Sequence, residues 1–139
     1  ARIVFGDDGA RSRLEAITHP LVAEESARRA RAAGERAIVV HDVPLIVEKG
    51  LAGRYDVVVV VGASEEVRMA RLIAQRGMTP EDARARIRAQ AGDGARRAVA
   101  DVWLDNSGTE EDLREAVRRL WRERLVPRAG GAARDGGRR

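Results

Sequence analysis

A single aspartate at the end of an apolar run is the strongest indication of chemistry in this sequence. Residues 38–44 read Ile-Val-Val-His-Asp-Val-Pro, and Asp42 stands where the apolar run ends. Because Pro44 lacks the N–H that strand pairing needs, we expect a short strand over residues 38–40, with Asp42 at its carboxyl tip. Open α/β sheets bind ligands outside such tips. Asp42 is therefore predicted to hold a ligand or a metal ion, with a turn cap as the alternative.

The elements that would position this acid alternate between apolar runs and helical spacings. Five consecutive valines at 57–61 predict a strand that is buried on both faces, as in a parallel sheet covered by helices. Residues 102–104 predict a further strand. The alternation predicts one α/β domain, a three-layer parallel sheet with helices on both faces.

Helices are predicted from apolar spacing and from capping residues. Residues 10–33 have helical spacing that Pro20 interrupts, which predicts a kink or two abutting helices closed by Gly34. Further helices are predicted from Ser64 to Gly77, from Thr79 to about residue 90, and from Thr109 until Pro127 stops the last one. Residues 127–139 carry no apolar side chain larger than alanine after the proline, and are expected to be a disordered Arg/Gly tail.

Composition excludes several classes of protein. There is no cysteine, so a disulfide framework and a thiolate metal site are excluded. The net charge is +4, and the arginines alternate with acids in the way of solvated helix faces, which argues against nucleic acid as a partner. No apolar run is long enough to cross a bilayer, and no charged leader opens the sequence. We expect a cytoplasmic protein that does not bind membranes.

Several motifs in order then become informative together. Each is weak alone, but their order and spacing over about residues 3–125 resemble the dephospho-coenzyme A kinase family. They are Leu14-Glu15-x-Ile17-x-His19-Pro20, Asp42-Val43-Pro44-Leu45 with Glu48, Arg71-Leu72-x3-Arg76, Gln90, and Ala100-Asp101 through Asn106-x-Gly108. The resemblance implies a P-loop kinase fold related to adenylate kinases, with residues 1–126 as a partial kinase domain. It also implies ATP with Mg²⁺ as phosphate donor and the ribose 3′-hydroxyl of dephospho-coenzyme A as acceptor.

The resemblance implies a role for individual residues as well. Asp42 resembles the acid that holds Mg²⁺ through water. Arg71 and Arg76 resemble arginines that neutralise the transferring phosphates, at the start of a lid covering about residues 76–97. Asn106 and Gly108 lie in a loop that resembles the adenine-side contact.

Three further residues are implied substrate contacts, each with a structural alternative. His19 belongs to the helical part at about 10–33 that is associated with the acceptor, or it forms a hydrogen bond at a helix junction. Glu48 contacts substrate or begins a helix. Arg96 matches a basic position of the family. Asp101, by contrast, is expected to act at the start of a strand and not as a catalyst.

One departure from the family is large. The Gly-x4-Gly-Lys-Ser/Thr loop, which cradles the phosphates and binds Mg²⁺, does not occur in the sequence, and Lys49 is the only lysine among 26 basic residues. The family's general base is not matched either. We expect that an N-terminal segment is missing and that these residues alone have no kinase activity. Another small-metabolite kinase of the superfamily, and a non-catalytic kinase relic acting as a binding module, remain alternatives.

Overall fold

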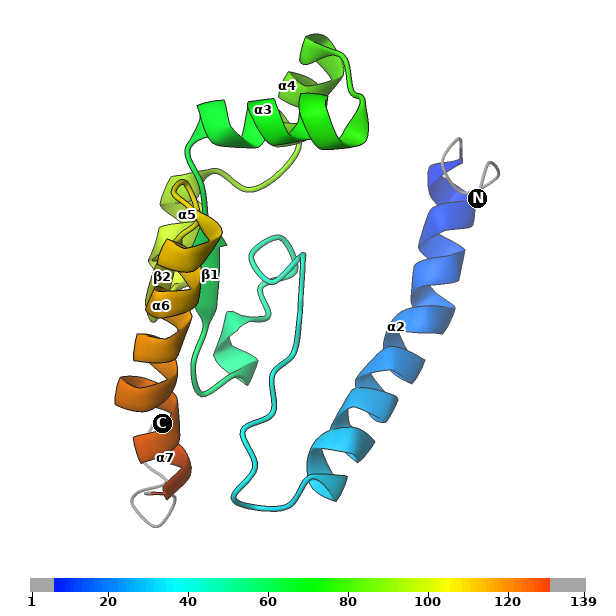
Figure 1. Ribbon diagram of the computed structural model, residues 1–139. Helices are drawn as coiled ribbons and strands as arrows, with labels where there is room; N and C mark the ends of the chain where they lie inside the picture. The colour runs from blue at the N-terminus through cyan, green and yellow to red at the C-terminus, as the bar shows by residue number, and fades with distance from the viewer. Residues whose placement is uncertain (1–6, 131–139) are drawn as a thin grey trace. The chain divides into compact units, whose positions relative to one another are not determined.

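A computed structural model of the protein describes residues 7–130. The described residues form two compact units, which are treated separately: residues 7–40 with 126–130, and residues 41–125. Figure 1 shows the helices and strands of both units. The predicted tail over residues 131–139 lies outside the described residues.

The first unit is built on one long helix, α2, over Asp8–Ala32. The carboxylate of Asp7 begins the helix by accepting the N–H of Ala10 at 3.0 Å, and Gly34 follows its end with φ 87°. The prediction that Gly34 closes this helix is confirmed. A break into two helices at Pro20 does not occur, because proline removes only one backbone bond from a helix of 25 residues.

A carboxylate held by two arginines marks the last turns of α2. Glu25 accepts hydrogen bonds at 2.7 Å from both Arg28 and Arg29. These hydrogen bonds lower the pKa of Glu25 from 4.5 to about 2, and the bonds from Arg28 have a larger effect than the bond from Arg29. The ion pairs therefore stabilise the helix fully above pH 4.5, and their contribution is lost as the pH falls toward 2.

Replacing these arginines should move the titration of Glu25. In the double variant Arg28→Ala/Arg29→Ala we expect the pKa of Glu25 to return toward 4.5, since both donors are gone. Carboxyl chemical shifts followed by NMR between pH 1.5 and 6 measure it. Arg31→Ala, a loss of charge one turn farther along, is the control. A pKa that stays near 2 in the double variant would contradict the structure.

The helical path after residue 109 extends beyond the predicted stop. Helix α6 over Glu110–Leu120 continues into the π-helical turn η2 at Trp121–Leu125 and then into α7 at Val126–Gly130. The prediction that Pro127 ends the helix, and that disorder starts there, is therefore wrong for residues 127–130. Pro127 follows directly after the π-helical turn η2, where the regular hydrogen bonding of α6 is already interrupted, and a proline is tolerated at such a position.

The second unit contains a two-stranded parallel sheet. Strand β1 covers Val59–Gly62 and β2 covers Val102–Asp105, with Val60 opposite Trp103. The parallel pairing and the helices around it confirm the predicted α/β class. The strand predicted over residues 38–40 is not formed, since no described strand runs beside it to bond its backbone.

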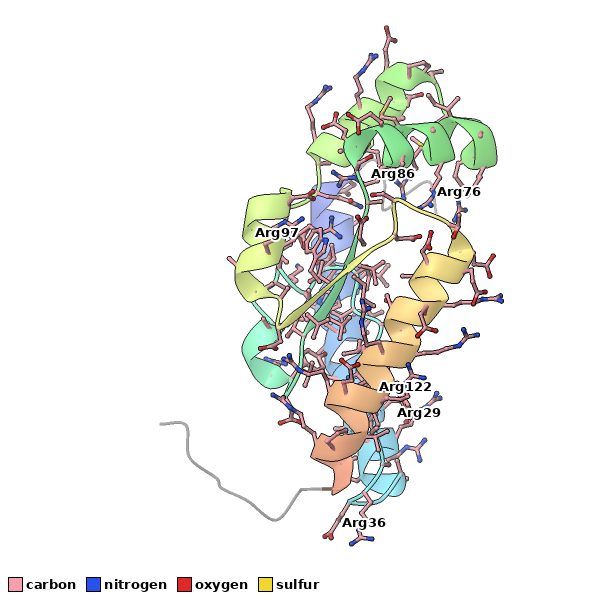
Figure 2. All side chains as sticks on the ribbon, turned by 60° about the vertical axis from the view of Figure 1, so that its left-hand side comes forward. Arg29, Arg36, Arg76, Arg86, Arg97 and Arg122 are labelled. Carbon is pink, nitrogen blue, oxygen red and sulfur yellow. The ribbon has the colours of Figure 1, made fainter. Side chains whose placement is uncertain are left out.

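Helices cover the sheet unevenly. Because side chains alternate along a strand, Val60 and Trp103 share one face and Val61 and Leu104 share the other. Helix α5 lies against β1 and α6 against β2, on opposite sides of the strands (Figure 2). Val58 and Val60 are buried, but Val59 and Val61 are exposed. The prediction that the valine run is buried on both faces is thus wrong, because α6 covers β2 but leaves this side of β1 open.

Four helices and two turns complete the second unit. Their starts follow the predicted capping residues, with Ser64, Thr79 and Thr109 each accepting a backbone N–H. The elements besides α6 and η2 are the 3₁₀ turn η1 at Ala52–Arg54, α3 at Glu65–Arg76, α4 at Pro80–Arg88 and α5 at Asp93–Val99. Helix α5 was not predicted, since it contains or adjoins Gly92 and Gly94, and glycine is a poor helix former. Gly92 is instead the residue that caps α5.

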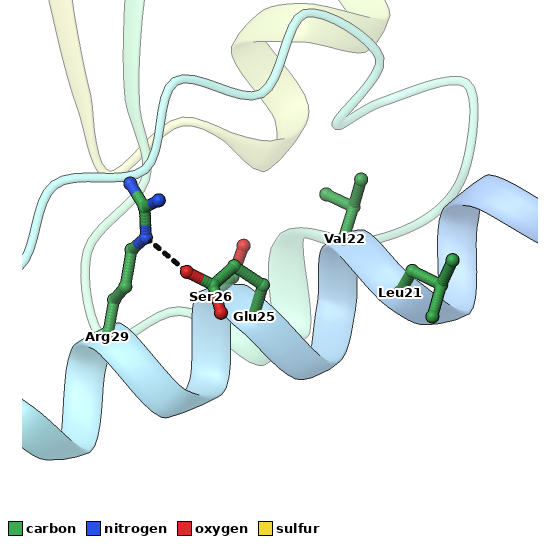
Figure 3. A pocket seen from close by; sticks show the side chains of 5 residues that line it. All are labelled: Leu21, Val22, Glu25, Ser26 and Arg29. Carbon is green, nitrogen blue, oxygen red and sulfur yellow. Dashed lines mark hydrogen bonds and ion pairs between the residues drawn. The ribbon is translucent and has the colours of Figure 1, made fainter.

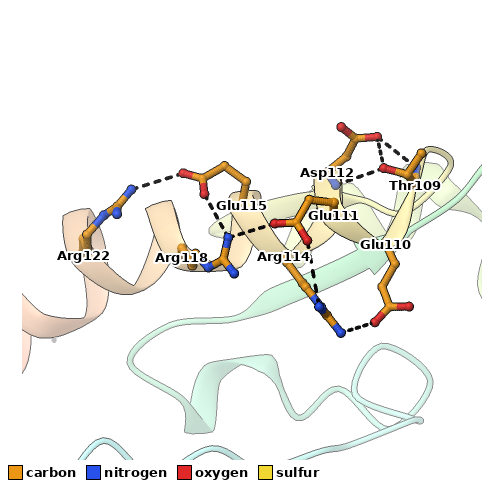
Figure 4. A network of polar contacts seen from close by, with 8 residues as sticks. All are labelled: Thr109, Glu110, Glu111, Asp112, Arg114, Glu115, Arg118 and Arg122. Carbon is orange, nitrogen blue, oxygen red and sulfur yellow. Dashed lines mark hydrogen bonds and ion pairs between the residues drawn. The ribbon is translucent and has the colours of Figure 1, made fainter.

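The charges on α6 confirm one interpretation of the composition. Glu110, Glu111 and Glu115 form ion pairs with Arg114, Arg118 and Arg122 along the exposed side of the helix (Figure 4). These pairs are open to water and contribute little to stability. The alternation of acids and arginines in this stretch is a solvated helix face, as predicted.

Candidate active site

Polar side chains gather where both strands of the sheet end. A pocket of about 180 Å³ opens there in the second unit. Its lining comes from the segments after β1 and β2, from β2 itself and from α5: Ala63, Ser64, Asp93, Arg97, Trp103, Asp105 and Ser107. The carboxyl ends of parallel strands are the usual ligand-binding edge of an α/β sheet.

The indole of Trp103 lines this pocket. The Arg97 guanidinium lies 3.9 Å from the centre of the indole ring, a cation–π distance, and Figure 2 shows Arg97 between α5 and the strands. Gly62 leaves room for the ring, since a Cβ at that position would lie 1.9 Å from Trp103 Cζ2. Glycine is therefore required at the end of β1 by close packing.

Arg96 binds the outer edge of β1. Its Nη2 donates to the carbonyl of Val61 at 2.8 Å. The carbonyls of Val58 and Gly62 accept from Val102 and Asn106 of the neighbouring strand segment, so the carbonyl of Val61 points away from β2. Arg96 thus satisfies a backbone acceptor that no described strand bonds.

Asp93 connects α5 with α3. Its Oδ1 lies 3.2 Å from Arg96 Nη1 and 3.6 Å from Arg68 Nη2. Both arginines are largely buried, with 22–23% of their side chains exposed. Pairing of these charges offsets the cost of removing them from water.

Glu48 contacts the segment between α4 and α5. Its Oε1 accepts the N–H of Ala91 at 3.0 Å. This bond lowers the pKa of Glu48 from 4.5. Smaller contributions in the same direction come from the N–H of Glu48 itself and from the charge of Arg96. Two predicted substrate residues, Glu48 and Arg96, are therefore brought close enough to interact.

The loop after β2 is held by its own backbone and by serine. The N–H of Asn106 bonds the carbonyl of Gly62 at 2.7 Å, and the N–H of Ser64 bonds Ser107 Oγ at 2.8 Å. Two hydrogen bonds from Ser107 lower the pKa of Asp105, and the bond from the hydroxyl has a larger effect than the bond from the backbone N–H. The predicted nucleotide residues Asn106 and Gly108 thus lie beside the pocket, on a loop tied to the end of β1.

The predicted metal residue lies in a different setting from the one expected. Asp42 is exposed and belongs to an irregular segment over residues 37–43, not to the tip of a strand. The reason is the missing pairing of residues 38–40. Across residues 7–130 there is no group of three or more His, Cys, Asp or Glu side chains that could hold a metal ion.

The predicted phosphate arginines both lie on α3. Arg71 is half-buried, and Arg76 is exposed as the last residue of the helix, before Gly77 turns the chain with φ 62°. Residues five apart on a helix project about 140° from each other. In this conformation the two arginines cannot reach one phosphate together.

His19 lies outside the second unit. It is an exposed residue of α2, one position before Pro20. A hollow of about 400 Å³ elsewhere on α2 is lined by Leu21, Val22, Glu25, Ser26 and Arg29, all from this one helix (Figure 3). Nothing from a second element shapes it, so it is a surface feature of α2 and not a binding site.

Asp101 acts at the start of β2, as predicted. Its Oδ2 accepts the N–H of Val58 at 2.8 Å, and its own N–H donates to the carbonyl of Val58 at 2.9 Å. The side chain therefore extends the backbone pairing of the two strands by one bond. This supports a structural role for Asp101.

Removing this carboxylate should loosen the beginning of β1. For Asp101→Ala we expect loss of about 1–2 kcal/mol and faster exchange of the Val58 amide, because a half-buried N–H loses its acceptor. Asp101→Asn keeps an acceptor oxygen and should lose less. Hydrogen exchange and urea unfolding measure the two effects. Equal exchange of Val58 in the alanine variant and the parent protein would refute this role.

The residues of the site that were not predicted include Gly62, Arg68, Asp93 and Arg97. Gly62 could have been noticed, as a glycine that directly follows five valines. The other three are charged residues among many, and only their contacts across α3, α5 and the sheet distinguish them.

The comparisons with known proteins agree with the motifs. A family model described as dephospho-CoA kinase matches residues 1–112. The chain is 54% identical over 123 residues to a dephospho-CoA kinase of Mycobacterium leprae (strain TN), covering 88% of this chain and 30% of that protein. It is 50% identical over 121 residues to the dephospho-CoA kinase of Thermobifida fusca (strain YX), covering 87% and 60%. The chain therefore spans only 30% to 60% of the length of these relatives.

The fold comparison extends to a solved structure. The chain resembles the crystal structure of TT1252 from Thermus thermophilus with a TM-score of 0.65 and 33% identity, covering 89% of this chain and 64% of that one. Among the helices of residues 7–130, none is both long and apolar enough to span a membrane. From the match over residues 1–112 and the relatives that are about half identical, the chain belongs to the dephospho-CoA kinase family.

Proposed function

We propose that these residues are part of a cytoplasmic enzyme that transfers the γ-phosphate of ATP to the ribose 3′-hydroxyl of dephospho-coenzyme A, giving coenzyme A. The observation that carries the proposal is the family match over residues 1–112. The structure supports it by placing the loop of Asn106 and Gly108, and Arg96, at the carboxyl ends of the two strands.

Mg²⁺ fits the residues in a limited way. Asp42 is a single exposed carboxylate. Among residues 7–130, no group of three or more His, Cys, Asp or Glu side chains could bind the ion without water or phosphate ligands. This agrees with the usual binding of Mg²⁺ in kinases, through one or two carboxylates together with substrate phosphates. Bound Mg²⁺ would neutralise negative charge on the phosphates during transfer. Asp42 would hold it through water.

The remaining residues would bind and orient the two substrates. Arg71 and Arg76 would neutralise charge on the transferring phosphate, the main form of catalysis in phosphoryl transfer. Asn106 and Gly108 would contact the nucleotide. His19 and Arg96 are the candidates for the acceptor side, whereas the carboxylate of Glu48 already accepts the N–H of Ala91.

The 139 residues by themselves are proposed to be inactive. They contain no Gly-x4-Gly-Lys-Ser/Thr sequence, and that loop supplies the backbone N–H groups and the lysine that hold the ATP phosphates in P-loop kinases. Positioning and charge stabilisation supply nearly all of the catalysis in this reaction.

The test compares two proteins. The product of the full open reading frame that encodes these residues, and residues 1–139 alone, are each incubated with Mg-ATP and dephospho-coenzyme A, and the products are analysed by mass spectrometry. We expect coenzyme A from the first protein only. Product from the short protein would overturn its proposed inactivity, and the absence of product from both would overturn the proposed reaction.

The same sequence feature favours a second candidate, a kinase relic that binds partners without catalysis. Calorimetry with ATP and with dephospho-coenzyme A separates the two, because a relic should bind neither. A different phosphate acceptor, tested in the same assay, would indicate another small-metabolite kinase of the superfamily.

A further inference from the structure

We infer that Glu48 is a positioning residue that holds the returning end of the lid, and does not contact the substrate. This inference rests on the proposed function, since the lid over about residues 76–97 is part of it. Glu48 was predicted from the sequence as a substrate contact, and the geometry assigns it a different task.

The first argument is the place of its partner in the chain. Ala91 lies between the end of α4, capped by Ala89, and Gly92, which caps α5. Ala91 therefore lies in the returning part of the predicted lid, on the link from α4 to α5. Glu48 bonds the N–H of this residue at 3.0 Å across 43 positions of sequence.

The second argument is that the segment beyond this point is also held. Two residues later, Asp93 pairs with Arg68 of α3, the helix that leads into the lid. Arg96 pairs with Asp93 and bonds the Val61 carbonyl at the end of β1. The start and the return of the lid are thus connected through Asp93, and Glu48 adds a contact from a separate segment.

The third argument is electrostatic. Dephospho-coenzyme A and ATP are both polyanions, and a carboxylate that remains ionised repels their phosphates. The bond from Ala91 and the charge of Arg96 favour the ionised form of Glu48. A charged carboxylate that is already bonded to the backbone suits a structural contact better than a phosphate-side one.

The mechanism follows from what the lid carries. Arg76 is the last residue of α3, and α3 packs on α4. Holding residue 91 limits the positions that the segment between α3 and α5 can adopt. Loss of Glu48 should therefore reduce the fraction of molecules in which the lid arginine is correctly placed, and leave the contacts to the acceptor intact.

The first experiment does not depend on the proposed function. Hydrogen exchange of the Ala91 amide is measured by NMR in residues 1–139 carrying Glu48→Ala or Glu48→Gln. We expect roughly threefold to tenfold faster exchange in Glu48→Ala. Glu48→Gln should remain near the parent value, since its amide oxygen still accepts the N–H. Glu123→Ala, another exposed glutamate, is the matched control. Unchanged exchange in Glu48→Ala would refute the contact.

The second experiment uses the product of the full reading frame. We expect Glu48→Ala to lower kcat by roughly threefold to tenfold with KM for dephospho-coenzyme A unchanged, and Glu48→Gln to restore most of kcat. A rise in KM with constant kcat would instead show a substrate contact and overturn the inference. If the parent protein has no activity, the proposed function fails, and the exchange result still decides the contact.

Discussion

Gly62→Ala should be among the most destabilising single substitutions in the second unit. The added Cβ would lie 1.9 Å from Trp103 Cζ2 and 2.6 Å from Cε2, well inside contact distance. Trp103 cannot move away freely, because Arg97 covers its ring. Overpacking of this kind costs about 1–3 kcal/mol. We expect a loss in that range, measured by urea unfolding followed through tryptophan fluorescence.

Two further variants test the cause. Gly53→Ala adds the same methyl group where no atom lies within 4 Å, and should leave stability nearly unchanged. In the background of Trp103→Ala, Gly62→Ala should cost much less, because the clashing ring is absent. A full loss of stability in this background would show that the clash with Trp103 is not the reason.

Arg71→Ala and Arg76→Ala should have the largest effects on activity, in the product of the full reading frame. Removing a group that stabilises transition-state charge lowers kcat by about 10²–10³-fold. The control is Arg124→Ala, an exposed arginine of η2. It separates a specific role from a general loss of positive charge, which matters in a chain with 26 basic residues.

The structure adds a condition to this prediction. Arg71 and Arg76 project in different directions on α3, so both act on one phosphate only if the last turn of α3 opens. Gly77, already at φ 62°, is the residue after which the chain changes direction. If kcat falls for Arg71→Ala but not for Arg76→Ala, the last turn stays helical during catalysis and Arg76 has no role.

Helix starts could be predicted because their signals are local. Thr109 and Asp112 form a capping box in which the side chain of each accepts the backbone N–H of the other. At the starts of α3 and α4, the side chains of Ser64 and Thr79 each accept one backbone N–H. These bonds span three residues, so the sequence alone specifies them. The α/β class could be predicted for a related reason, from the alternation of apolar runs with helical spacings.

The strand over residues 38–40 and the burial of the valine run could not be predicted correctly. A strand exists only if another strand forms hydrogen bonds with it. Residues 38–40 have the composition of a strand, but no described strand pairs with them. Five valines suit either a two-sided or a one-sided environment. Only the placement of α5 and α6 leaves Val59 and Val61 exposed.

The sequence by itself determined the family motifs and the capped helices, because each depends on residue types at short or characteristic spacing. Only the tertiary structure decided what Glu48 and Asp93 do. Their partners, Ala91 for the first and Arg68 for the second, lie on other segments of the chain. An aspartate or glutamate is the same residue in the sequence whether it binds a substrate or a backbone N–H, and only its contact in the structure distinguishes the two roles.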